Sequence, residues 1–192
     1  MIAADALLSA YASGWFPMAV ARGEIRWYSP DPRGIIPLDT FHVSRRLARS
    51  LRQQRFEIRV DTSFRAVIQA CADREDSDGD WIDEEIIESY CALHEQGFAH
   101  SVEAWRDGAL AGGLYGVAIG GAFFGESMFH RETDASKAAL AALVERLRDR
   151  GYTLLDTQWV TEHLAQFGAV EVPRRRYLSM LDVALKVDVT SI

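Results

Sequence analysis

The stretch from Gly112 to Phe129, GGLYGVAIGGAFFGESMF, decides the fold. Two apolar runs flank Gly120-Gly121, a pattern that predicts two antiparallel strands joined by a tight turn. The second run carries a single carboxylate, Glu126. Burying a carboxylate among apolar side chains is costly unless it has a partner or a chemical task. Glu126 is therefore the first candidate for a functional residue.

The length of the turn determines which residue lies opposite Glu126. A two-residue Gly120-Gly121 loop pairs Glu126 with Tyr115, whereas a three-residue loop that adds Ile119 pairs it with Leu114. We favour the second register, because it makes an apolar pocket with one acid at its edge, suited to a bulky apolar group that carries an amine. The alternative is a core hairpin whose glutamate reaches solvent. Alternation would line the pocket with Leu114, Phe124 and Met128 and place Phe123, Ser127 and Phe129 on the other face.

Outward from this hairpin, helical and strand patterns are mixed. A helix separates strand 122–129 from strand 153–159, so these two strands should be parallel, while the earlier strands form an antiparallel meander. We expect an α+β domain with a GNAT-like mixed sheet and flanking helices, open where the strand direction changes. The proline-punctuated residues 29–37 should be irregular. The predicted helices cover 3–13, 44–54, 63–73, 83–96, 135–150 and 161–167; the other strands are 25–29, 56–61, 100–106 and 109–119.

A second polar intrusion occurs in residues 153–160, TLLDTQWV, where Asp156 and Gln158 fall on one face of a predicted strand. An acid and an amide at this spacing can hold and deprotonate an attacking amine or orient a carbonyl. The alternative is a structural pair that caps a neighbouring loop. Metal-ligand spacing, a nucleophilic serine context and the usual phosphate-binding fingerprints are absent from the sequence, so we expect no metal and no cofactor.

Composition and charge narrow the class further. The chain has 192 residues and a net charge of −7, which argues against nucleic-acid binding driven by overall charge. One basic segment, 44–55, nevertheless carries five arginines. It is either a solvated helix face or a phosphate-binding surface. Cys71 and Cys91 have no metal spacing and are expected to be free and buried. We expect no secretion signal, because Asp5 interrupts the apolar N-terminus, and no membrane partner.

Several ordered blocks resemble the leucyl/phenylalanyl-tRNA–protein transferase family. They are spread over nearly the whole chain, which makes chance similarity improbable. The blocks are Y-x-x-G-x-F-P-M from Tyr11, W-Y-S-P-D-P-R from Trp27, W-I at Trp81, L-H-x-x-G-x-A-H-S-V-E-x-W from Leu93, G-G-L-Y-G-V from Gly112, G-E-S-M-F from Gly125, A-S-K from Ala135, D-x-Q from Asp156 and G-A-x-x-x-P-R-x-x-Y from Gly168.

The resemblance implies a cytoplasmic, monomeric aminoacyltransferase. Such an enzyme takes leucine or phenylalanine, and methionine less well, from aminoacyl-tRNA as its co-substrate. It joins the amino acid to the N-terminal Arg or Lys of an acceptor protein and so marks that protein for degradation as an N-degron. Two alternatives stay open: a transferase with another acceptor, such as a cell-wall peptide, and a non-catalytic binder of N-degrons.

The resemblance also implies roles for named residues. The catalytic group would be Asp156, Gln158 and Glu126, with Gln158 orienting the attacking amine, Asp156 polarising Gln158 and Glu126 holding an amino group. The side-chain pocket would be lined by Leu114, Phe123, Met128 and Leu155. Contacts to the aminoacyl-adenosine would come from Tyr11, Trp81 and Tyr90. The tRNA backbone would meet Arg45, Arg46, Arg49 and Arg52.

Two domains are expected from the same comparison. Residues 1–43 would be a short remnant of a small N-terminal domain, and residues 44–192 the GNAT-like catalytic domain. Met18 stands where tryptophan can follow F-P in the family, and Leu114 stands where methionine can line the pocket. The preference between leucine and phenylalanine is therefore left open.

Overall fold

The computed structural model describes residues 1–21, 23–73 and 81–192. Its centre is a seven-stranded sheet in the order β4-β5-β6-β7-β8-β3-β9, and a separate hairpin pairs β1 with β2. The strands are β1 (Phe16–Ala21), β2 (Glu24–Tyr28), β3 (Arg33–Ile36), β4 (Glu57–Val60), β5 (Ala99–Arg106), β6 (Ala109–Ile119), β7 (Ala122–His130), β8 (Leu154–Gln158) and β9 (Val170–Val172).

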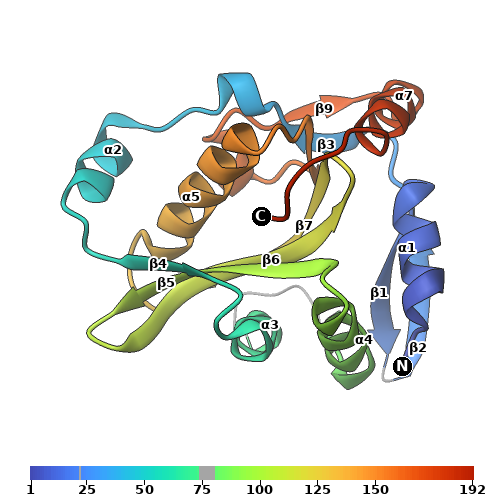
Figure 1. Ribbon diagram of the computed structural model, residues 1–192, viewed down its shortest axis with the longest axis horizontal. Helices are drawn as coiled ribbons and strands as arrows, with labels where there is room; N and C mark the ends of the chain where they lie inside the picture. Colours follow the sequence, from blue (N-terminus) through green and yellow to red (C-terminus); the bar gives the residue numbers. More distant parts are fainter. Residues whose placement is uncertain (22, 74–80) are drawn as a thin grey trace.

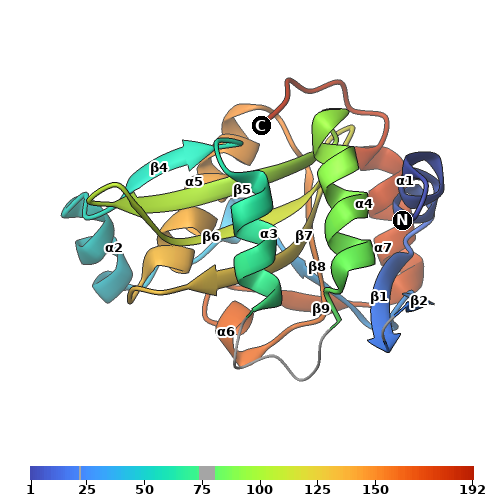
Figure 2. The same ribbon diagram turned by 90° about the horizontal axis from the view of Figure 1, so that it is seen from below.

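Helices cover both faces of the large sheet, as Figures 1 and 2 show, with α5 on one face and α3 and α4 on the other. One apolar core contains residues of α1, α3, α4 and α7, and a second contains residues of α2 and α5. The helices are α1 (Ala4–Ala12), α2 (Arg45–Arg52), α3 (Phe64–Ala72), α4 (Glu84–Glu95), α5 (Ala135–Asp149), α6 (Glu162–Ala165) and α7 (Arg174–Ala184), with a 3-10 turn at Leu38–Thr40. No helix in the described ranges is long and apolar enough to cross a bilayer.

The expected α+β architecture is confirmed, including its change of strand direction. All neighbouring strands of the large sheet are antiparallel except β7 and β8, which are parallel. These two strands pair only over Ala122–Phe124 and Leu154–Asp156. Beyond that point β7 runs on to His130, so the two strands part. The opening expected at this place in the sheet therefore exists.

The register expected around Glu126 is wrong. Ile119 pairs with Ala122, so the turn is the two-residue Gly120-Gly121 loop that we had not favoured. Neither alternative gives the partner of Glu126, because the register shifts between Tyr115 and Gly116 and leaves Glu126 as an extra residue in a β-bulge.

The bulge also reverses the alternation of side chains beyond it. Phe124 and Phe129 lie in the core with α3 and α4, whereas Phe123 and Met128 lie in or against the core with α5. The predicted pocket face of Leu114, Phe124 and Met128 is therefore wrong for Phe124. A single added residue shifts the two-residue period by one, which moves every later side chain to the opposite face.

The segment expected to be irregular, 29–37, contains β3, which lies between β8 and β9 in the large sheet. Residues 1–43 thus contribute a strand to the sheet of the second expected domain; the division at residue 43 stays a prediction. All four residues of β3 are buried, so the strand has no polar-apolar alternation to reveal it. The hairpin strand β1, the three-residue β9 and the C-terminal helix α7 were also missed.

Candidate active site

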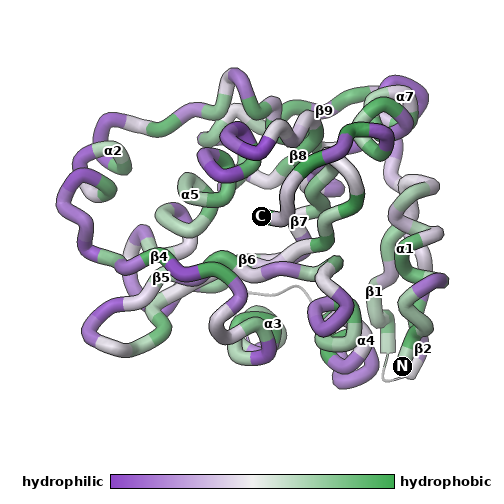
Figure 3. The backbone as a smooth tube through the Cα atoms, in the orientation of Figure 1, coloured by the Kyte–Doolittle hydropathy of each residue, from purple (hydrophilic) through white to green (hydrophobic). Residues whose placement is uncertain are grey.

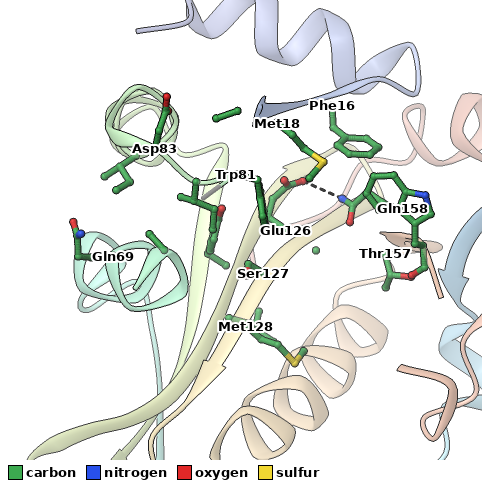
Figure 4. Close-up of a pocket in the computed structure, with 18 of the residues that line it drawn as sticks. Phe16, Met18, Gln69, Trp81, Asp83, Glu126, Ser127, Met128, Thr157 and Gln158 are labelled. Atoms are coloured by element: carbon green, nitrogen blue, oxygen red, sulfur yellow. Dashed lines mark hydrogen bonds between the residues drawn. The ribbon is translucent and has the colours of Figure 1, made fainter. Parts of the chain in front are cut away.

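A cavity of about 1520 Å³ opens where β7 and β8 part. We call it the main cavity. Glu126, Ser127 and Met128 of β7 lie along it, and Thr157 and Gln158 lie at the end of β8. Figure 4 shows the Gln158 side chain directed to Glu126, with Phe16 and Met18 beyond them and Met128 farther along β7.

Glu126 has neutral hydrogen-bond partners. Its Oε1 accepts a bond from Nε2 of Gln158 at 3.1 Å, and its Oε2 accepts one from the hydroxyl of Tyr90 at 3.4 Å. The hydroxyl of Tyr90 is in turn hydrogen-bonded to that of Tyr11. Within the described ranges, no cation lies at ion-pair distance from this carboxyl. The arrangement holds the side chain in place without neutralising a charge on it.

The surroundings of Glu126 change its acidity. Loss of water on burial, opposed in part by hydrogen bonds from Tyr11 and Tyr90, raises the pKa of Glu126 to about 8. Burial also raises the pKa of both tyrosines well above the ordinary value, so their hydroxyl groups stay protonated and can donate. Glu126 is therefore a carboxyl that gains and loses its proton close to neutral pH.

Asp156 lies behind this group, away from the cavity wall. Both carboxylate oxygens bond the guanidinium of Arg33, at 3.0 and 2.7 Å, and the hydroxyl of Tyr177 donates to Oδ2 at 2.6 Å. Oδ1 also accepts the backbone N–H of Gln158 at 2.9 Å. Gln158 has a φ of 58°, the left-handed region that costs a non-glycine residue energy. The Asp156 carboxylate thus holds the backbone of Gln158 in the conformation that aims its amide at Glu126.

Arg33 and Tyr177 are site residues that were not predicted from the sequence. Arg33 is fully buried, donates to the carbonyl of Gly14 at 3.0 Å and lies over the rings of Phe16 and Tyr177. Both residues stand inside the quoted blocks, P-D-P-R and P-R-x-x-Y. The blocks contained both residues, but an arginine that follows two prolines is typical of a surface loop. Nothing in the local sequence therefore indicated that Arg33 would be buried in the site.

A second buried carboxylate, Glu103, shows what a structural acid looks like here. It accepts bonds from the backbone N–H of Thr62 and Ser63 at 2.9 and 2.8 Å, the hydroxyl of Ser101 at 2.9 Å and the indole N–H of Trp105 at 2.8 Å. These donors satisfy the carboxylate and fix the chain just before α3. Glu126, with fewer and longer bonds, differs in having part of its surface on a cavity.

The expected side-chain pocket lies on the α5 side of the main cavity. Leu114, Met128 and Leu155 line the cavity, whereas Phe123 does not line it and packs within the same core. Two leucines of α5, which sequence reasoning left out, complete the wall. We call this wall the apolar slot: Leu114, Met128, Leu140, Leu143 and Leu155.

The three aromatic residues expected at the aminoacyl-adenosine fall into two positions. Trp81 lines the main cavity opposite the slot, near Met18. Tyr11 and Tyr90 are fully buried and reach Glu126 from behind, so their contact is with the carboxyl and not with the cavity.

The four arginines expected at the tRNA gather on one side of α2. Arg45, Arg46, Arg49 and Arg52 are exposed, and Leu47, on the other side of the helix, is buried. At 100° per residue the four side chains span about 120°. Within the described part of the chain, none of the four takes part in an ion pair. Figure 3 shows α2 at the edge of the molecule.

The fold and the site together define an α+β protein with one apolar slot that ends in a carboxyl and an amide. The family model described as leucyl/phenylalanyl-tRNA protein transferase matches residues 35–182, and the model of that family's N-terminal domain matches residues 1–31. The chain belongs to this family.

Individual relatives agree with the family assignment. A protein of Gloeobacter violaceus named leucyl/phenylalanyl-tRNA–protein transferase is 58% identical over 182 residues, covering 94% of this chain and 93% of the relative. One of Paramagnetospirillum magneticum with the same name is 57% identical over 190 residues, covering 96% and 90%. Among solved structures, L-PGS from Bacillus licheniformis matches with a TM-score of 0.45 and 16% identity over 84% of this chain and 54% of that one.

Proposed function

We propose that the protein transfers leucine or phenylalanine, and methionine less efficiently, from aminoacyl-tRNA to the N-terminal Arg or Lys of an acceptor protein. The modified protein is thereby marked for degradation as an N-degron. The observation that carries the proposal is the Gln158–Glu126 hydrogen bond at the edge of the apolar slot. Membership of the family supports the choice of donor and reaction.

The reaction needs positioning more than energy input, because the ester of aminoacyl-tRNA is already activated. The acceptor amine attacks the ester carbonyl carbon, the C–N bond forms, the bond to the ribose oxygen breaks, and the amine proton ends on the released ribose hydroxyl. We propose that the aminoacyl side chain enters the apolar slot, which brings the carbonyl near Gln158 and Glu126. Holding both reactants in this geometry supplies much of the rate.

Gln158 and Glu126 have separate tasks in this proposal. The Gln158 amide donates to Glu126 through Nε2, so its oxygen is left to accept a hydrogen bond from the attacking amine. Glu126, with a pKa of about 8, holds an amino group when ionised and can exchange a proton near neutral pH. Asp156 acts through the Gln158 backbone, which makes it a positioning residue.

The slot sets the choice of amino acid by shape. Leucine, phenylalanine and methionine are unbranched at Cβ. Isoleucine and valine carry a second substituent on Cβ, which widens the side chain near the backbone and restricts its χ1 rotamers. A wall made of Leu114, Leu140 and Met128 can reject the branched side chains on that ground. We further propose that aminoacyl-tRNA is the co-substrate and that no cofactor is needed. The protein would act as a monomer in the cytoplasm, where charged tRNA is made.

The test mixes the purified protein with labelled leucyl-tRNA and a peptide that begins with arginine. Wild-type protein should transfer leucine, and the same peptide beginning with alanine should receive none. Gln158→Ala should lower kcat/KM by about 10²-fold or more, the usual cost of a lost proton-transfer or orienting group. Exposed Gln96→Ala, at the end of α4, is the control for a lost amide. Absence of transfer from every aminoacyl-tRNA would leave only the binding alternative.

A further inference from the structure

A second cavity, of about 430 Å³, lies between the start of α2 and the start of α5. We call it the small cavity. His130, Ser136 and His163 line both cavities, so the small cavity adjoins the end of the apolar slot. Its charged lining residues are Arg46 on α2, Lys137 on α5 and Asp134 just before α5, and its other polar lining residues are Ser44, Thr133 and Gln166. None of these residues has a part in the transfer step proposed above, and only Arg46 is expected at the tRNA backbone.

Ser136 is the observation that points to a ligand. The residue is only 4% exposed, yet it borders both cavities. Its hydroxyl has no hydrogen-bond partner in the described part of the chain. Because Ser136 borders both cavities, its hydroxyl is available to bond a ligand there.

The start of α5 adds further unpaired donors to the same place. Asp134 precedes the helix with a φ of 71° and makes no side-chain cap hydrogen bond. Ala138 bonds back to the carbonyl of Asp134 and Ala135 to that of Glu132, but the backbone N–H groups of Ser136 and Lys137 find no acceptor within the described ranges. Free N–H groups and the helix dipole favour an anion at such an end.

The charged side chains that line the small cavity also favour an anion. Arg46 is exposed and takes part in no ion pair within the described residues. Lys137 is held loosely, with Nζ 3.8 Å from Asp134 Oδ1 and 3.5 Å from Gln166 Oε1. The Asp134 carboxylate is the one acid among the described residues that line this cavity. Two cations against one carboxylate leave a net positive site, which a phosphate group would suit.

We propose that the small cavity binds a phosphodiester of the donor RNA, namely the one that joins its last two nucleotides. This inference rests on the proposed function. The ester sits on the terminal ribose, so this phosphodiester is the nearest to the reacting carbonyl. The RNA strand would then run from α2, past Arg46 and Lys137 of the small cavity, to Ser136, which also lines the main cavity that holds the apolar slot.

The experiment compares donors that differ by one phosphate. Leucyl-adenosine has none, the leucyl ester of cytidylyl-adenosine has one, and leucyl-tRNA has the whole backbone. Lys137→Gln should lower kcat/KM about tenfold for the dinucleotide and for tRNA and leave leucyl-adenosine unchanged. Ser136→Ala, a smaller change at a buried position, should act in the same direction. The control Arg49→Gln on α2 should affect tRNA alone.

Two results would overturn the proposal: equal losses of Lys137→Gln on all three donors, or no loss on the dinucleotide. A binding measurement tests the site even if the protein shows no transfer activity. Uncharged cytidylyl-adenosine should bind wild-type protein more tightly than Lys137→Gln, and the binding should weaken as salt rises. If inorganic phosphate alone binds as tightly as the dinucleotide, the cavity serves a small anion and not an RNA end.

Discussion

Gln158 owes its position to residues that never touch the cavity. Its strained backbone is fixed by the Asp156 carboxylate, and that carboxylate is fixed by Arg33 and Tyr177. From the sequence, the polar residues inside apolar strands could be selected, which gave Glu126, Asp156 and Gln158. The partners could not be selected, because Arg33 and Tyr177 look ordinary in their local sequence and gain meaning only when β3 and α7 pack beside β8.

Removing the charge of Asp156 should lower the free energy of unfolding more than removing the Tyr177 hydroxyl that donates to it. Asp156→Asn leaves the buried Arg33 without its counter-charge, so we expect a loss of about 3–5 kcal/mol in the free energy of unfolding, together with loss of activity. Tyr177→Phe deletes one hydrogen bond to a charged group and should cost about 1.5–3 kcal/mol. Urea unfolding of both variants measures the difference. Equal costs would contradict the role given to the ion pair.

Glu126 should make the folded state less stable as pH rises. Its pKa is raised from 4.5 to about 8 in the folded protein, so between these values the folded state binds more protons than the unfolded state. Stability therefore falls with pH across this window, by up to about 1.4 kcal/mol per pH unit. Glu126→Gln should remove this part of the slope in urea unfolding between about pH 5 and about pH 8. An unchanged slope would assign the pH dependence to other groups.

At the scale of elements, the bulge in the β6–β7 hairpin brings Glu126 to the cavity. The hairpin itself was predictable, since Gly120-Gly121 between apolar runs is a strong signal. The bulge was not, because a regular register satisfies the same alternation and only the packing of Phe123 and Phe124 decides between them. Short elements such as β3 and β9 were missed for a related reason: three or four residues carry no period to recognise.

Of the two glycines paired beside the bulge, Gly116 and Gly125, Gly116 should tolerate a side chain less well. A Cβ placed there would lie 2.2 Å from the carbonyl oxygen of Phe124, whereas a Cβ at its partner Gly125 would meet only the carbonyl oxygen of Asp156, at 3.5 Å. We expect Gly116→Ala to lower the free energy of unfolding by about 3 kcal/mol or more and Gly125→Ala to change it by less than about 1 kcal/mol. Denaturant melts of the matched pair measure this, and similar losses would contradict the register.

Across the whole molecule, exposed positive charge is concentrated on the helix α2. The chain carries a net charge of −7, yet the exposed arginines of α2 stand together at one end. Overall charge alone argued against an RNA partner, and the clustering of the arginines could be suspected from sequence. Their position next to the small cavity could not, because it depends on α2 and α5 sharing one core through Leu47.

The salt dependence of tRNA binding should show whether the arginines of α2 contact RNA phosphates. Replacing Arg49 and Arg52 with glutamine should weaken binding and reduce the slope of log K against log salt by about 0.9 for each phosphate that is no longer neutralised. The matched control replaces Arg175 and Arg176, two exposed arginines of α7 at the other end of the molecule, and should leave the slope unchanged. Binding titrations at several salt concentrations measure both variants. Equal slopes for the two pairs would remove α2 from the RNA path.

The polar network around Asp156 joins segments that are far apart in the sequence: Arg33 belongs to β3, and Tyr177 lies in the first turn of α7. A nascent chain therefore cannot complete this network until Tyr177 has been synthesised and α7 has packed beside β8. The donors proposed above are also substrates of the ribosome, so the growing polypeptide cannot compete for them before α7 has emerged and folded.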